Sequence, residues 1–308
     1  MHPAFSVIFF TTLSGLGYGL WFFLGCQTLL THSQSSQTPL VALVLGFILV
    51  SIGLLSSTLH LGKPLRAWRA FSQWRSSWLS REGILAIACF VPALMWIAQI
   101  LLNRNFIPYS VLAVFIVVLS IATVACTAMI YASLQPIPAW QHRYVVPVYL
   151  LFALLTGGLL SVGIAEIDPS PISEYVIFGF ILIAVLLGVL KKRYWKDIDS
   201  QTLPSRASAL GLKADQTVAV FERPHTEANY LTKEMGYVLA RKHSRKLRLI
   251  ALLLFSWLPV LFCVATLMFP YTISAYLMLA ATCSAYLGAL VERWLFFAEA
   301  KHAVMQYY

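Results

Sequence analysis

Eight apolar runs, each long enough to cross a bilayer, constrain the fold of this 308-residue chain more than any other feature. A transmembrane helix needs about 20 predominantly apolar residues. The runs lie at 5–30, 40–60, 83–103, 107–131, 144–165, 172–190, 249–269 and 272–297. They are continuous rather than alternating, so they predict helices and not the strands of a membrane barrel. We therefore expect an all-α integral membrane protein with eight transmembrane helices.

The composition agrees with a membrane protein. Hydrophobic residues make up 59% of the chain and charged residues 11%, whereas a soluble domain carries about 25% charged residues. The five cysteines lie in apolar runs without a CxxC pair, so neither a structural zinc site nor an iron–sulfur cluster is expected in this chain. The first 30 residues contain no Lys or Arg, which indicates a retained helix rather than a cleaved signal peptide.

The basic residues gather on one predicted face. With eight helices, both termini share a face with residues 60–82, 132–145 and 191–248. That face holds 21 of the 22 Lys and Arg residues, and the opposite face holds only Arg104. The positive-inside rule therefore predicts that both termini and the long loop are cytoplasmic. The basic face could hold anionic lipid headgroups or an acidic soluble partner, and no compact nucleic-acid-binding module is predicted.

The chain divides into two predicted halves. Residues 1–131 are expected to form a four-helix bundle that carries the functional site. Residues 132–308 are expected to form a supporting four-helix bundle with the cytoplasmic loop 191–248. Gly15 and Gly19 form a GxxxG pattern in the first apolar run, which favours close approach by another helix.

Residues 60–82 are unlike a passive loop. Pro64 can begin a helix, and apolar and basic side chains then alternate at near-helical spacing. The apolar positions are Leu65, Trp68, Phe71, Trp74 and Trp78, and the basic ones are Arg66, Arg69 and Arg75. This pattern predicts a short helix lying in the membrane interface between the second and third transmembrane helices.

His60 and Glu82 flank this segment at the edge of the apolar runs. Ionisable groups at that depth are costly, and they indicate a functional site by default. A histidine can relay protons near neutral pH, so this pair suits the oxidation or reduction of a quinone, which moves two electrons and two protons. The alternative is structural: Glu82 favours the positive end of a helix and pairs with Arg81 or Arg66.

Several basic and aromatic residues could complete such a quinone site. Lys63, Arg66 and Arg69 could donate hydrogen bonds to the quinone carbonyls, and Trp74 and Arg81 lie in the same segment. His142, in the sequence PAWQHRY, could line the same cleft.

A b-type haem is not expected, because its axial ligands are usually histidines inside the bundle. None of the histidines lies in the middle of an apolar run; they are His2, His32, His60, His142, His225, His243 and His302.

Three sequence blocks resemble a known family. The opening MHPAFSVIFFTTLSGLGYG and the block HLGKPLRAWRAFSQWRSSWLSREG resemble the membrane-anchor subunit of DMSO reductase-type complexes and, more distantly, polysulfide-reductase-like anchors. The block PHTEANYLTKEMGYVLARKH at 224–243 resembles anchors of cytoplasmic sulfite-oxidising complexes.

The resemblance implies a function and partners. Such anchors lie in the bacterial cytoplasmic membrane beside a molybdopterin catalytic subunit and a four-cluster iron–sulfur subunit, and they exchange electrons with the quinone pool, ubiquinone or menaquinone. Their quinone-site His and Glu fall on His60 and Glu82. We therefore expect the quinone-reactive subunit of an oxidoreductase, with sulfite oxidation favoured.

Three alternatives remain open at this point. One is the quinol-oxidising anchor of a DMSO or sulfoxide reductase, and another is a purely structural anchor with quinone bound elsewhere. The third is an anion permease, which would be expected to carry inverted repeats and polar groups at mid-membrane. The polar groups of this chain cluster at one face instead.

Overall fold

The computed structural model is helical throughout the part of the chain that it describes. It describes residues 3–31, 37–59, 63–165, 173–201, 206–213, 216–219, 221–222 and 239–304, and no strand occurs among them. His60 and most of the block at 224–243 lie outside these residues. The predicted all-α class is confirmed.

Eight helical segments among the described residues are long and apolar enough to cross a membrane, as the sequence predicts. They are α1 (Phe5–Thr31), α2 (Gln37–Thr58), α3 (Trp78–Leu102), α4 (Tyr109–Ala132), α5 (Val145–Ala165), α6 (Glu174–Ser200), the continuous α8 (Leu239–Leu252), η3 (Leu253–Trp257) and α9 (Leu258–Thr266), and α10 (Tyr271–Ala298). The η3 stretch is π-helical and directly precedes α9, which has Pro259 in its first turn. Wider turns of this kind absorb local irregularities in a long helix.

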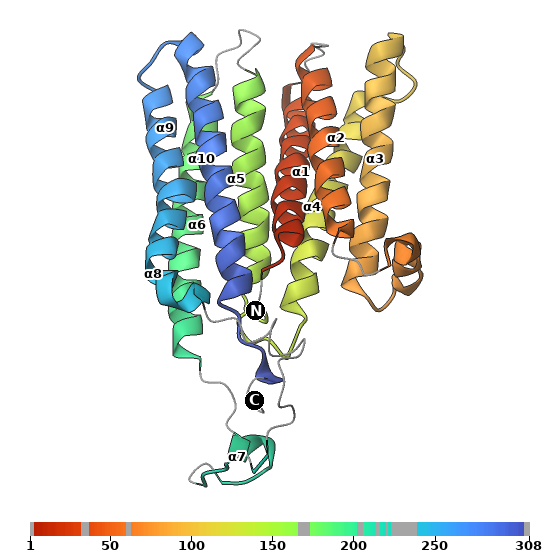
Figure 1. The fold of residues 1–308 in the computed structure, drawn as a ribbon. Helices are drawn as coiled ribbons and strands as arrows, with labels where there is room; N and C mark the ends of the chain where they lie inside the picture. Colours follow the sequence, from red (N-terminus) through yellow and green to blue (C-terminus); the bar gives the residue numbers. More distant parts are fainter. Residues whose placement is uncertain are drawn as a thin grey trace.

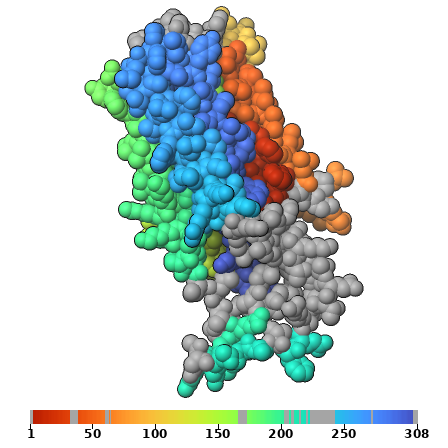
Figure 2. All heavy atoms as spheres, turned by 60° about the vertical axis from the view of Figure 1, so that its left-hand side comes forward, coloured from red at the N-terminus to blue at the C-terminus, as the bar shows by residue number. Residues whose placement is uncertain are grey.

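The helices stand side by side in one bundle (Figure 1). The start of α1, the end of α10, the short α7 (Arg206–Ala209) and the interfacial segment η1 (Pro64–Gln73) all lie at the same end. Side chains of α8, α9 and α10 cover the face between α6 and the first two helices (Figure 2). The end of the bundle that carries η1 and α7 is the one that the sequence predicts to be cytoplasmic.

The predicted interfacial helix is present as η1, a ten-residue 3₁₀ helix. Its Phe71 ring packs on Gly83 of α3, where an added Cβ would lie 2.8 Å from the ring. The Ser80 hydroxyl also donates a hydrogen bond to the Ala70 carbonyl. These two contacts hold η1 against the first turns of α3.

Two helices extend further than hydropathy predicts. The apolar run of α6 ends near residue 190, but the helix continues to Ser200, and α8 begins at Leu239 within the predicted loop 191–248. The predicted loop is therefore too long at both ends. A helix end predicted from hydropathy falls at the first lysine. The backbone hydrogen bonds of the helix continue past it wherever the charged side chains find partners or reach water.

α1 crosses α5 with backbone against backbone at Gly19 and Gly157. A Cβ on Gly19 would lie 1.9 Å from the Ala153 carbonyl oxygen, and one on Gly157 would lie 2.2 Å from the Gly19 carbonyl carbon. The predicted close approach is thus confirmed for Gly19. Gly15 is not needed for it, because a Cβ there would meet only the Ala153 Cβ at 3.9 Å. α1 also packs on α2 and α4, and α5 packs on α10, so the two predicted halves share a continuous interface.

This crossing predicts a sharp difference between two glycines of α1. Gly19→Ala should destabilise the bundle by about 1–3 kcal/mol, because overpacking forces backbone shifts, and Gly15→Ala should leave stability near that of the wild type. Thermal unfolding of each purified variant, followed by circular dichroism in detergent, measures the difference. Equal unfolding temperatures for the two variants would contradict the crossing.

Candidate functional site

Glu82 lies near the start of the third transmembrane helix, as the sequence predicts. α3 begins at Trp78, and Ser77 caps it by accepting a hydrogen bond from the Ser80 amide. The Glu82 side chain is 4% exposed. The Thr127 hydroxyl of α4 donates a hydrogen bond to Glu82 Oε1, so the carboxyl group points into the bundle.

The structural alternative for Glu82 finds little support. Ser77 is the capping residue, and among the described residues no Lys or Arg forms an ion pair with Glu82. Arg81 instead donates from Nε to the Trp74 carbonyl at 3.0 Å and from Nη2 to the Arg75 carbonyl at 2.5 Å. Arg81 therefore fixes the turn that joins η1 to α3.

Four other predicted residues of 60–82 form an exposed surface on η1, next to the start of α3. Lys63, Arg66, Arg69 and Trp74 are all exposed on or next to η1. Because η1 packs on Gly83, this basic and aromatic surface lies over the helix turn that carries Glu82. His60, the remaining member of the predicted pair, precedes this surface in the chain and lies outside the described residues.

His142 lies beside α6. Its Nε2 is 3.2 Å from Asp197 Oδ2, and its Nδ1 accepts a hydrogen bond from the Tyr144 amide at 3.3 Å. Burial lowers the pKa of His142, although Asp197 acts to raise it. A neutral imidazole with its proton on Nε2 satisfies both contacts. The described contacts place His142 with Asp197 and Tyr194 rather than with η1.

Three charged side chains are buried together between α6 and α10. Lys191 Nζ is 2.5 Å from Glu292 Oε1, and Arg293 Nη1 is 2.6 Å from Glu292 Oε2. Their exposures are 2%, 0% and 3% for Lys191, Glu292 and Arg293. Glu292 therefore pairs with both cations. The three groups leave one positive charge unbalanced when all are ionised.

Aromatic rings surround both cations of this cluster. Lys191 Nζ lies 3.9 Å from the centre of the Tyr194 ring, and Arg293 Cζ lies 3.5 Å from that of Tyr149. Such cation–π contacts partly replace the water that the cations lose on burial. They help to keep charged groups inside a bundle that hydropathy describes as apolar.

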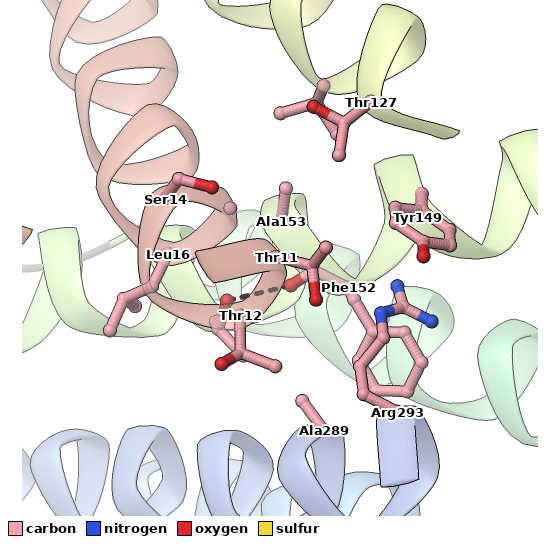
Figure 3. Close-up of a pocket in the computed structure, with 13 residues that line it drawn as sticks. Thr11, Thr12, Ser14, Leu16, Thr127, Tyr149, Phe152, Ala153, Ala289 and Arg293 are labelled. Atoms are coloured by element: carbon pink, nitrogen blue, oxygen red, sulfur yellow. Dashed lines mark hydrogen bonds between the residues drawn. The ribbon is translucent and has the colours of Figure 1, made fainter. Parts of the chain in front are cut away.

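A polar cavity of about 20 Å³ lies between α1, α4, α5 and α10. Figure 3 shows hydroxyl groups from three of these helices around it, with the Arg293 guanidinium reaching in beside the Tyr149 hydroxyl. Thr127, which holds Glu82, also lines this cavity. Its polar side chains are those of Thr11, Thr12, Ser14, Thr127, Tyr149, Thr156 and Arg293.

A second ionic group joins Arg248 of α8 to the ends of α6 and α10. Arg248 binds Asp199 at 2.6 Å and Glu299 at 2.9 Å. The Asp199 side chain is 61% exposed, whereas that of Glu299 is 7% exposed. Burial raises the pKa of Glu299, and Arg248 acts in the opposite direction. Among the described residues, no three His, Cys, Asp or Glu side chains gather in a way that could hold a metal ion.

Lys191 and Thr127 are functional candidates that sequence reasoning missed. Lys191 continues a helical face with Leu187, Tyr194 and Trp195, all of which are buried. That periodicity is the available signal, but the apolar run ends just before it. A threonine in an apolar helix carries no comparable signal, because most such hydroxyls bond to the carbonyl of their own helix.

The buried cluster predicts a large difference in stability between two acid-to-amide variants. Glu292→Gln leaves two buried cations without an anion, which should cost about 3–5 kcal/mol. Asp199→Asn removes an exposed partner and should cost less than about 1 kcal/mol. Denaturation of each purified variant by dodecyl sulfate would give both values. Similar losses in the two variants would mean that Glu292 is not ionised in the folded bundle.

Comparison with known proteins agrees with this architecture. The chain is 30% identical to the C subunit of sulfite dehydrogenase from Allochromatium vinosum, over 100% of this chain and 99% of that protein. It is also 26% identical to the YnfH component of an anaerobic dimethyl sulfoxide reductase of Escherichia coli, over 38% of this chain and 42% of that protein. The C component of the anaerobic dimethyl sulfoxide reductase of E. coli is 25% identical over 43% of this chain and 48% of its own length.

The family model described as DMSO reductase anchor subunit (DmsC) matches residues 1–298. This match covers all eight membrane-spanning helices. The resemblance inferred from the sequence blocks is therefore confirmed, and the chain belongs to the DmsC family of DMSO reductase anchor subunits.

Proposed function

We propose that this chain is the quinone-reactive anchor of a cytoplasmic sulfite dehydrogenase. A molybdopterin subunit would oxidise sulfite, and a four-cluster iron–sulfur subunit would pass the electrons to quinone at this chain. The similarity to a sulfite dehydrogenase component over the whole chain supports this choice. The similarity to the sulfoxide reductase components covers less than half of the chain.

The observation that carries the proposal is the environment of Glu82. Its carboxyl group is buried at the edge of the membrane-spanning region, is held by one hydroxyl, and has no cationic partner among the described residues. A buried carboxylate without a cation is strongly disfavoured. A carboxyl group in such a place is suited to gaining and losing a proton during a reaction.

The residues around Glu82 fit a quinone headgroup. A quinone that is reduced takes up two electrons and two protons. The exposed cations Lys63, Arg66 and Arg69 can donate hydrogen bonds to its oxygens, and the Trp74 ring offers an apolar surface. The apolar outer faces of α2 and α3 can contact the isoprenoid tail, since Ile52, Leu55 and Ile87 are at least half exposed.

Four residues of the site have distinct roles in this proposal. Glu82 and His60 donate protons to the two quinone oxygens. Thr127 orients the Glu82 carboxyl group, and Arg81 fixes the turn that positions η1 above it. The basic end of the bundle would bind the iron–sulfur subunit, which brings its electrons close to the quinone.

A quinol-oxidising sulfoxide reductase would use the same site in the opposite direction, with Glu82 and His60 accepting protons. The partial similarity to two dimethyl sulfoxide reductase components keeps it as the second candidate. The permease alternative loses its support, because the chain belongs to a family of oxidoreductase anchor subunits.

The proposal predicts that Glu82→Gln slows quinone-linked turnover by roughly 10²–10⁴-fold, the usual loss when a positioned proton donor is removed. His60→Ala should act in the same direction. Sulfite oxidation with an artificial soluble acceptor should be retained, because the catalytic subunit is unchanged. Both assays are made on the purified complex, which should contain the same subunits as the wild type.

Glu174→Gln is the matched control for Glu82→Gln. Glu174 is an exposed acid in the first turn of α6, at the opposite end of the bundle, so its amide should keep both activities. Equal loss of both activities in Glu82→Gln, or loss of neither, would remove Glu82 from the quinone site.

The charge distribution predicts the orientation of the chain. A reporter enzyme inserted near Leu212 or fused after the last helix should be active in the cytoplasm, and one inserted at Ser173 should be active in the periplasm. The reason is the concentration of Lys and Arg at one end of the bundle. A periplasmic signal at Leu212 would contradict both the orientation and the cytoplasmic partners.

A further inference from the structure

We propose that the polar cavity between α1, α4, α5 and α10 carries a proton-transfer route, which supplies Glu82 from the buried cluster of Lys191, Glu292 and Arg293. The inference rests on the proposed function, because it assumes that Glu82 gives a proton to quinone. It adds the path by which Glu82 regains that proton. The route runs from Lys191 through Glu292 and water in the cavity to Thr127 and Glu82.

The first step of the route joins Glu82 to the cavity. The Thr127 hydroxyl donates a hydrogen bond to Glu82, and Thr127 is one of the residues that line the cavity. A hydroxyl group can give its proton to a carboxylate while it accepts another from water. Only O–H bonds break and form in this step, and no atom changes its oxidation state. The two electrons for the quinone come from the iron–sulfur partner.

The second step needs water in the cavity, and the lining of the cavity favours it. A volume of about 20 Å³ exceeds the roughly 10–15 Å³ that one water molecule requires. The Thr12, Ser14 and Thr156 hydroxyls donate to carbonyls of their own helices, so their oxygens remain acceptors. The Arg293 guanidinium is a donor. A water molecule here would find the two to four polar partners that it needs.

An unpartnered hydroxyl group supports the same conclusion independently. Tyr149 is 3% exposed, and its hydroxyl has no hydrogen-bond partner among the described residues. Buried hydroxyl groups are seldom left unsatisfied. Because Tyr149 lines the cavity beside Arg293 (Figure 3), water in the cavity is the partner that would satisfy it.

The third step joins the cavity to the buried cluster. Arg293 contacts Glu292, and Glu292 contacts Lys191. Glu292 and Lys191 can each carry a proton, whereas Arg293 stays charged and orients the water.

Charge balance couples the two ends of this route. The buried cluster of Lys191, Glu292 and Arg293 carries one excess positive charge when ionised. An ionised Glu82 on the far side of Thr127 would offset that charge. Loss of a proton from Glu82 to quinone is therefore less costly than it would be for an isolated buried carboxyl group. A proton that then moves from the cluster through the cavity to Glu82 removes both charges.

The test uses conservative variants in the intact complex, assayed for quinone-linked turnover and for turnover with a soluble artificial acceptor. Thr127→Val keeps the side-chain shape but removes the hydroxyl, and should slow the quinone-linked rate by roughly 10²-fold. Its KM for quinone and its acceptor-linked rate should be unchanged. The solvent deuterium isotope effect should rise, because proton transfer becomes rate-limiting.

Two further threonine variants serve as controls. Thr127→Ser restores a hydroxyl and should return the rate close to that of the wild type. Thr123 lies one turn earlier in α4 and bonds to the Leu119 carbonyl at 2.7 Å, so Thr123→Val should leave the rate and the isotope effect unchanged. A Thr127→Val complex with the wild-type rate, or equal slowing in Thr127→Val and Thr127→Ser, would overturn the route.

Tyr149→Phe tests the cavity even if Thr127→Val fails to assemble. The variant removes a hydroxyl that bonds to no group in the described part of the chain, so stability should be kept while quinone-linked turnover falls and the isotope effect rises. An unchanged rate would overturn the role of the cavity water. If Glu82→Gln is slow while Thr127→Val and Tyr149→Phe are not, only the route is wrong. If Glu82→Gln is itself without effect, the proposed function fails.

Discussion

The backbone contact between α1 and α5 at Gly19 and Gly157 is the constraint on which the rest of the bundle depends. Membrane helices gain little from the hydrophobic effect against one another, so close packing and satisfied polar groups must hold them together. The two glycines bring the helices together about one turn from the polar cavity. Further along, small and hydroxylated residues of both helices face that cavity and leave space that bulkier side chains would fill.

The same packing explains why the bundle can hold charged groups. Lys191, Glu292 and Arg293 satisfy one another and rest against aromatic rings. Glu82 is different, because a threonine hydroxyl holds it and no cation among the described residues pairs with it. The described helices therefore contain a set of buried charges that is internally paired and a carboxyl group that is not. We propose that the paired charges stabilise the bundle and help to supply protons. We assign proton transfer to quinone to the carboxyl group of Glu82.

Much of the fold could be predicted from the sequence, and less of the site. The eight apolar runs follow from hydropathy, and the short helix that begins at Pro64 follows from the spacing of its apolar residues. The structure contains both. Glu82 could be singled out as an ionisable group at the membrane edge, but its contact with Thr127 depends on how α3 packs on α4. Hydropathy places Lys191 in a loop, because it cannot distinguish a lysine that enters water from one that finds a buried carboxylate. The contacts of His142 with Asp197 likewise depend on tertiary packing.

Redox-induced infrared difference spectroscopy of the complex in lipid tests the central claim most directly. Reduction of bound quinone should produce a carboxyl C=O band that shifts in deuterated water, because Glu82 changes its protonation or hydrogen bonding. The band should be absent from Glu82→Gln and retained in Glu174→Gln. An identical band in Glu82→Gln, or no carboxyl band in the wild type, would contradict the assignment of Glu82 as the proton donor to quinone.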